Sequence, residues 1–179
     1  MCLIWINTNS IAQPSIDSAI AFINSQHPDT LGMYTRFCSR SQLTLFLWKK
    51  DGNYFITNAS STQNKTHILD SISPLKYYFE NQKVIDHEKV KPFTFIAKNS
   101  SSGKLDTLQL NISHSCYSTF VLFGSNMSEK IVSDFDLQEN FSRGEVNIYS
   151  KSNSQNRLVI FFSKVKELTT KFNWDKPNL

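Results

Sequence analysis

The chain has 179 residues, which is enough for one domain of ordinary size. Hydrophobic residues make up 40% and aromatic residues 13%, so the composition excludes a disordered chain, and no apolar run is long enough for a membrane-spanning helix. The net charge is only +4, lysines outnumber arginines 15 to 4, and no dense basic cluster occurs, which argues against nucleic acid as a partner.

The N-terminal segment supports two interpretations. Residues 3–6 are apolar, and Ser10-Ile11-Ala12 places small residues at the two positions that a signal peptidase recognises. Residues 1–14 are therefore either the remnant of a signal or anchor, or a first buried strand. The short apolar run and the lack of a preceding basic residue favour the strand, and the signal remnant stays open. Residues 15–179 are expected to form a single α+β domain.

A helix is predicted over residues 15–26, because apolar side chains recur there at helical spacing and His27-Pro28 ends the pattern. The period then changes to that of strands, which are predicted at 34–39, 43–48 and 54–57. Asp51-Gly52 separates the last two runs, and this pair is a strong signal for a β-hairpin.

The second half of the chain continues the strand pattern. A short helix is expected to begin at Ser73-Pro74. Residues 125–143 are ambiguous, and residues 165–172 form an amphipathic segment. Further strands are predicted at 92–97, 105–112, 117–123, 144–149 and 158–162.

Antiparallel hairpins dominate this series of elements. The βαβ alternation of a doubly wound sheet is absent, and neither a GxGxxG motif nor a P-loop occurs. The sequence predicts an α+β domain with a mostly antiparallel curved sheet or a small β-barrel of about seven or eight strands. One N-terminal helix and one or two short helices are expected to accompany it.

The three cysteines bear on the cellular compartment. If the segment that contains Cys2 were removed, Cys38 and Cys116 would remain and could form a disulfide. The alternative is three buried free thiols in a reducing compartment. Ser and Asn account for 40 of the 179 residues, and such a weakly charged surface resembles that of a periplasmic or secreted protein more than that of a cytoplasmic one.

Few residues suggest chemistry. His114 and Cys116 would share one face of a strand, where a thiol and an imidazole could form a nucleophile. The spacing alone is weak evidence, and an edge histidine with a buried or disulfide-bonded cysteine is the favoured explanation. Asp134, Asp136 and Glu139 lack the further ligands of a calcium loop and are expected to be solvated. No metal motif and no cofactor signature occurs.

The aromatic residues are the remaining candidates for contacts. Most are expected to form the core, but some could line an apolar cleft for a small ligand or face a partner protein. The candidate contact residues are Trp48, Tyr77, Tyr78, Phe93, Phe95 and Phe120.

Three functions are compatible with these patterns. The first is a non-enzymatic, extracytoplasmic β-rich binding module that acts as an accessory subunit for a partner protein and could also bind a small apolar ligand. The second is a cytosolic interaction protein, such as an inhibitor or an immunity factor. The third is a thiol enzyme that uses Cys116 and His114. The absence of a catalytic pattern favours the first two.

Overall fold

A computed structural model of the chain describes residues 13–39, 41–59, 65–69, 73–113, 115–124, 129–142 and 144–174. The helices are α1 (Gln13–Ser25), α2 (Pro74–Ile85), the 3-10 turn η1 (Phe135–Leu137), α3 (Ser150–Ser154) and α4 (Arg157–Lys171). The strands are β1 (Thr30–Cys38), β2 (Ser41–Lys50), β3 (Asn53–Asn58), β4 (Thr66–Leu69), β5 (Thr94–Lys98), β6 (Leu105–Gln109), β7 (Tyr117–Leu122) and β8 (Glu129–Ser133).

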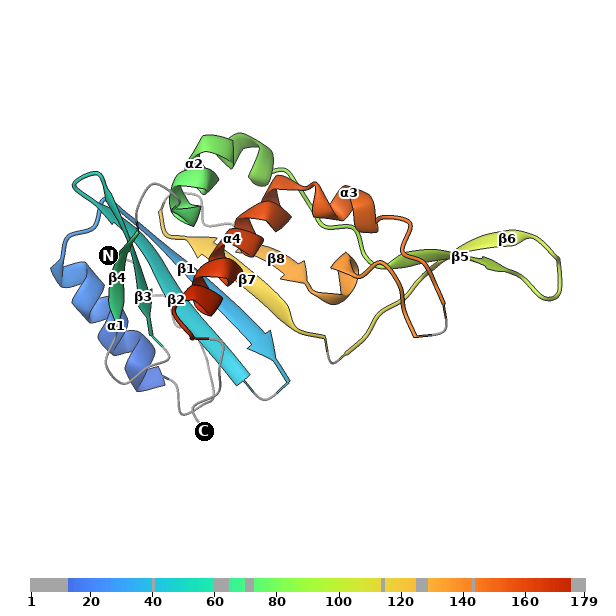
Figure 1. Cartoon of the computed structure of the whole chain (residues 1–179), viewed down its shortest axis with the longest axis horizontal. Helices are drawn as coiled ribbons and strands as arrows, with labels where there is room; N and C mark the ends of the chain where they lie inside the picture. The colour runs from blue at the N-terminus through green and yellow to red at the C-terminus, as the bar shows by residue number, and fades with distance from the viewer. Residues whose placement is uncertain are drawn as a thin grey trace.

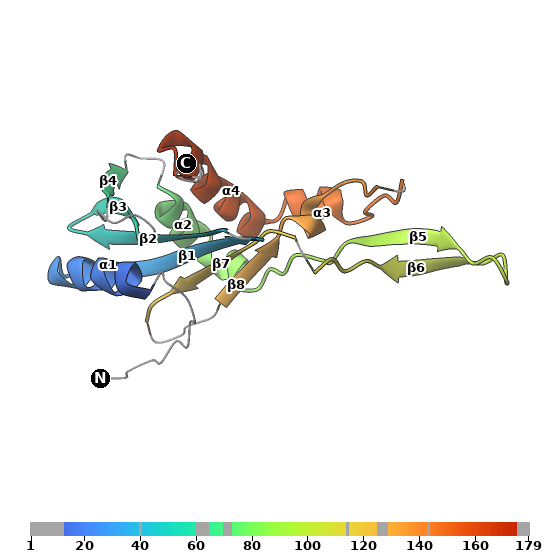
Figure 2. The ribbon, with the colours of Figure 1, turned by 90° about the horizontal axis from the view of Figure 1, so that it is seen from below.

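Six of these strands form one antiparallel sheet in the order β4-β3-β2-β1-β7-β8. Helix α1 covers one face of the sheet, and α2 and α4 cover the other (Figures 1 and 2). The sheet is open, so the α+β prediction is confirmed in its curved-sheet form and the β-barrel alternative is not realised. None of the helices in the described ranges has the length and apolarity needed to span a bilayer.

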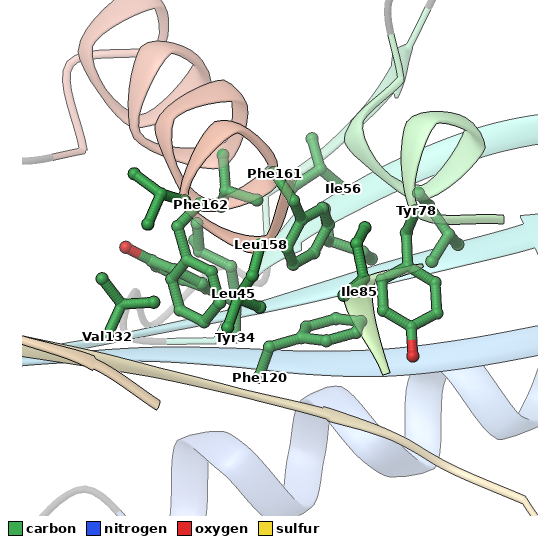
Figure 3. Packing of buried hydrophobic residues seen from close by; sticks show 14 of the residues in the cluster. Tyr34, Leu45, Ile56, Tyr78, Ile85, Phe120, Val132, Leu158, Phe161 and Phe162 are labelled. Atoms are coloured by element: carbon green, nitrogen blue, oxygen red, sulfur yellow. The ribbon is translucent and has the colours of Figure 1, made fainter. Parts of the chain in front are cut away.

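Alternation along β2 explains how the sheet fills two cores. Leu45 and Leu47 point to the face covered by α2 and α4, whereas Phe46 and Trp48 point to α1. On the first face, the ring of Phe161 from α4 lies 4.7 Å from that of Phe120 and 5.4 Å from that of Tyr78 (Figure 3). This aromatic cluster joins the two helices to the sheet.

The hairpin between β2 and β3 confirms the sequence signal at Asp51-Gly52. Lys50 pairs with Asn53, and Asp51 and Gly52 both adopt positive φ angles, 49° and 79°. Such angles at both central residues match the right-handed twist of the two strands.

Two predicted strands are wrong. Residues 158–162 belong to helix α4, whose first residue follows the cap Asn156; the Asn156 side chain accepts a hydrogen bond from the backbone N–H of Leu158. Residues 144–149 form no strand: they contain a bend, irregular backbone and a turn, with an isolated bridge from Val146 to Asn140. Conversely, the edge strand β4 was not predicted: the sequence indicated a polar loop up to residue 66 and no element between that loop and Ser73.

Candidate protein-interaction surface

Strands β5 and β6 form a separate two-stranded sheet that projects from the domain (Figures 1 and 2). We call residues 94–109 the arm. All five residues of β6 are exposed, and in β5 only Thr94 is buried. A two-stranded hairpin without a third strand is marginally stable in water, so the arm needs support at its base or from a partner.

The arm carries apolar side chains on both faces. Phe95 is paired with Leu108 on one face, and Ile96 and Leu105 lie on the other. Ile96 is 56% exposed, Leu105 72% and Leu108 46%. Of the eleven exposed large hydrophobic residues in the described ranges, three lie on the arm, and Val146 and Ile148 lie beside it. This end of the molecule is therefore the candidate interaction surface.

The tip of the arm is a tight turn fixed by Asn99. Its side-chain oxygen accepts hydrogen bonds from the backbone N–H groups of Ser101 and Ser102, and its amide donates to Asp106. Gly103 provides the positive φ angle of 67° that the return into β6 requires. The turn thereby holds the two strands in register.

Two buried asparagines hold the base of the arm. The side chain of Asn147 accepts hydrogen bonds from the N–H groups of Thr94 and Tyr149, and donates to the carbonyls of Asp136 and Gln138. Asn153 bonds both backbone groups of Lys91 in the same way, at 3.0 and 2.8 Å. A buried amide with all of these bonds made is costly to remove, so the base is a rigid support.

The carboxylate of Asp136 completes the base by accepting the N–H of Phe93 at 2.9 Å. Burial raises the pKa of Asp136 above its ordinary value, and the hydrogen bond from Phe93 opposes this shift only partly. The neighbouring Asp134 forms a bidentate pair with Arg36, at 3.1 and 2.6 Å. Both carboxylates therefore have structural partners, rather than lying in a solvated loop as the sequence predicted.

An open hollow of about 390 Å³ lies beside β5. One wall is formed by Phe95 and Ile96 of β5. The other is the segment 144–148, which carries the exposed side chains of Val146 and Ile148. The lining residues are Phe95, Ile96, Gly144, Glu145, Val146 and Ile148. The hollow is large enough to accept an apolar side chain from another molecule.

The candidate contact residues lie in different places. Phe95 belongs to the arm and lines the hollow. Tyr77 is half-buried, with the Nζ of Lys164 5.2 Å from its ring centroid. The other four candidates, Trp48, Tyr78, Phe93 and Phe120, have buried side chains, at most 3% exposed.

The structure brings Phe95 together with residues that the sequence did not single out, namely Ile96, Leu108 and Val146. The sequence predicted the two strands and the turn at Asn99–Gly103 between them, but not that this hairpin lies apart from the main sheet.

Cys38 and Cys116 lie at disulfide-bonding distance, with Cα atoms 4.3 Å apart. They connect the end of β1 to the residue before β7, two strands that pair in the sheet. In this state Cys116 carries no thiol, so a nucleophile at this position would require reduction. Cys2 and His114, the other residues of the thiol hypotheses, lie outside the described residues.

Within the described ranges, no three His, Cys, Asp or Glu side chains gather as metal ligands would. Comparison of the chain with family models, with curated proteins and with solved structures finds no match.

Proposed function

We propose that this chain is a non-enzymatic, extracytoplasmic binding module that presents its arm to a partner protein, as an accessory subunit would. The observation that carries the proposal is the projection of an apolar, exposed hairpin from an otherwise well-packed domain. Such an edge is an aggregation hazard unless another chain covers it, because its backbone groups and apolar side chains both remain available.

The proposed compartment follows from the cysteines. A disulfide persists in the periplasm or outside the cell and is rare in a reducing cytosol. The low share of charged residues and the high share of Ser and Asn support the same assignment. A cytosolic inhibitor or immunity factor would use the same arm, and the redox state of Cys38 and Cys116 in the native host separates the two.

The hollow beside β5 suggests how a partner would be held. An extended segment lying along β5 can bond its outer edge and place one apolar side chain between Ile96 and Val146. A small apolar ligand in the same hollow is the second candidate, favoured by the same lining residues.

Site-specific photo-crosslinking in the native host tests the proposal. A p-benzoylphenylalanine at position 96 is expected to give a discrete product that contains one partner protein. Val146→Lys should abolish this product, because it places a charge in the hollow. The matched control is the same probe at position 68, since Ile68 is also an exposed apolar strand residue but lies on β4.

Equal cross-linking at positions 96 and 68, or a product insensitive to Val146→Lys, would contradict a specific arm partner. Mass analysis with and without reduction settles the compartment. Cys38 and Cys116 should be alkylated only after reduction, whereas alkylation without reduction would favour the cytosolic alternative.

A further inference from the structure

The two edges of the arm are not equivalent. The N–H of Asn99 donates to the carbonyl of Lys104, and the N–H of Leu110 donates to the carbonyl of Phe93. These two bonds show which facing residue pairs of the hairpin exchange backbone hydrogen bonds. Because bonded and non-bonded pairs alternate, the backbone groups of Leu105, Thr107 and Gln109 point away from β5. In the described part of the chain, β6 has β5 as its one strand neighbour.

The corresponding edge of β5 is obstructed at its start. The N–H of Ile148 donates to the carbonyl of Thr94 at 2.9 Å, and the side chain of Asn147 accepts the N–H of Thr94. A long strand can therefore add to the arm more readily at β6 than at β5.

The sequence of β6 is suited to pairing with itself. A twofold axis relates two antiparallel copies of one strand. For the two copies to exchange backbone hydrogen bonds, a residue whose backbone groups point away from β5 must face such a residue of the second copy. Every axis that passes a residue of β6 meets this condition. An axis at Leu105 or Gln109 would leave the rest of β6 facing residues outside the strand. The central positions Asp106, Thr107 and Leu108 therefore remain. The axis at Asp106 would place two carboxylates directly opposite each other, which is unfavourable.

The axis at Leu108 gives the most favourable side-chain contacts. Phe95 is already the cross-strand neighbour of Leu108, so a row of Phe95, Leu108 and the same two residues of the second copy would cross one face of a four-stranded sheet. Thr107 would exchange backbone bonds with Gln109 of the second copy. The axis at Thr107 would lose the contact between the two Leu108 side chains and place each Leu108 opposite Asp106. The axis at Leu108 keeps that contact, although it places each Asp106 opposite Leu110 of the second copy.

We infer that a second copy of this chain covers β6, in an antiparallel twofold dimer with Leu108 opposite its own counterpart. The inference rests on the proposed function, because it gives one edge of the same arm a definite occupant. The hollows beside β5 lie on the outer edges of such a four-stranded sheet, so each copy could still bind its partner protein.

Disulfide trapping tests the dimer and its register. In a Cys2→Ser background, Leu108→Cys is expected to yield a covalent dimer under mild oxidation, because facing residues in a non-bonded pair lie close enough for a disulfide. Leu105→Cys is the matched control: it is more exposed than Leu108, at 72% against 46%, but lies on the other face of the sheet and away from the axis. Dimers that form equally with both variants, or with neither, would overturn the inference.

Sedimentation velocity over a concentration series gives an independent measurement without new cysteines. The unmodified chain is expected to dimerise reversibly, and Leu108→Lys to weaken the dimer at least about tenfold, because two ammonium groups would meet at the axis. Leu105→Lys should leave the dimer unchanged. A monomer at every concentration would overturn the dimer, while a specific photo-cross-link at position 96 would still support partner binding.

Discussion

Gly32 lies where β1 passes the ring of Phe120. A Cβ atom at position 32 would come within 2.7 Å of two atoms of that ring, and Phe120 is completely buried. We therefore expect Gly32→Ala to lower the free energy of unfolding by about 1–3 kcal/mol, the usual cost of overpacking a core. Urea denaturation measures this cost, and Phe120→Leu should reduce it when the two changes are combined. An alanine variant as stable as the original chain would contradict the close contact.

Asp136 predicts a particular pH dependence of stability. Because burial raises its pKa in the folded state, the folded chain binds the proton more tightly than the unfolded chain does. Asp136 therefore contributes its full stabilisation of the fold below its ordinary pKa of 3.8. This stabilisation is lost as the pH rises through the raised pKa of the folded state.

Asp136→Asn should remove this decline and keep an oxygen that accepts the N–H of Phe93. Urea denaturation of both chains from about pH 3 to about pH 7 measures the difference. Parallel stability profiles for the two chains would contradict the raised pKa.

The aromatic residues show how far residue patterns can predict a site. Sequence identifies Phe93 and Phe95 as members of one strand but not that the first is fully buried and the second lines a surface hollow. The difference arises because β5 leaves the domain after its first residue. Where a strand leaves the core is decided by packing and by buried amides such as Asn147, which local periodicity does not report.

Helix α4 shows the same limit for an element. Its apolar run from Leu158 to Phe162 fits a buried strand as well as a helix that packs on two sides. The deciding signals were the cap Asn156 and the continuation of helical spacing through Val165. By contrast, helix α1 and the hairpin at Asp51-Gly52 could be predicted. The apolar face of the helix and the turn type of the hairpin are both determined by residues close together in the sequence.

The arm is expected to be dispensable for the stability of the domain. Phe95 and Leu108 pair across the hairpin, so residues 96–107 can be replaced by a two-residue Asn-Gly turn. The free energy of unfolding should stay within about 1 kcal/mol of the original value, since β5 and β6 do not pair with the main sheet.

Phe93→Ala is the contrasting variant for this experiment. It lies at the base of the arm with its ring fully buried, and it should cost about 3–5 kcal/mol. A large loss of stability on shortening the arm would instead show that the arm and the domain unfold together.

At the scale of the whole molecule, the Cys38–Cys116 bond closes a large part of the chain. The two cysteines are 78 positions apart, so the bond restricts the unfolded chain and should contribute roughly 4 kcal/mol in the chain-entropy model. The double variant Cys38→Ser/Cys116→Ser should lose this amount in urea denaturation. The reduced original chain should match the double variant, and equal stability of the oxidised and reduced chains would contradict the predicted contribution.

The strand order also has a consequence for how the chain folds. Strands β2, β3 and β4 follow β1 directly, so this part of the sheet can assemble from near neighbours in sequence. The other side of β1 waits for β7, which arrives only after α2 and the arm have been synthesised. Closing such a long loop is slow, and during that interval the central strand presents an unpaired edge. A nascent chain would therefore benefit from a chaperone that shields β1 until β7 docks, and oxidation of the two cysteines would report the completion of that step.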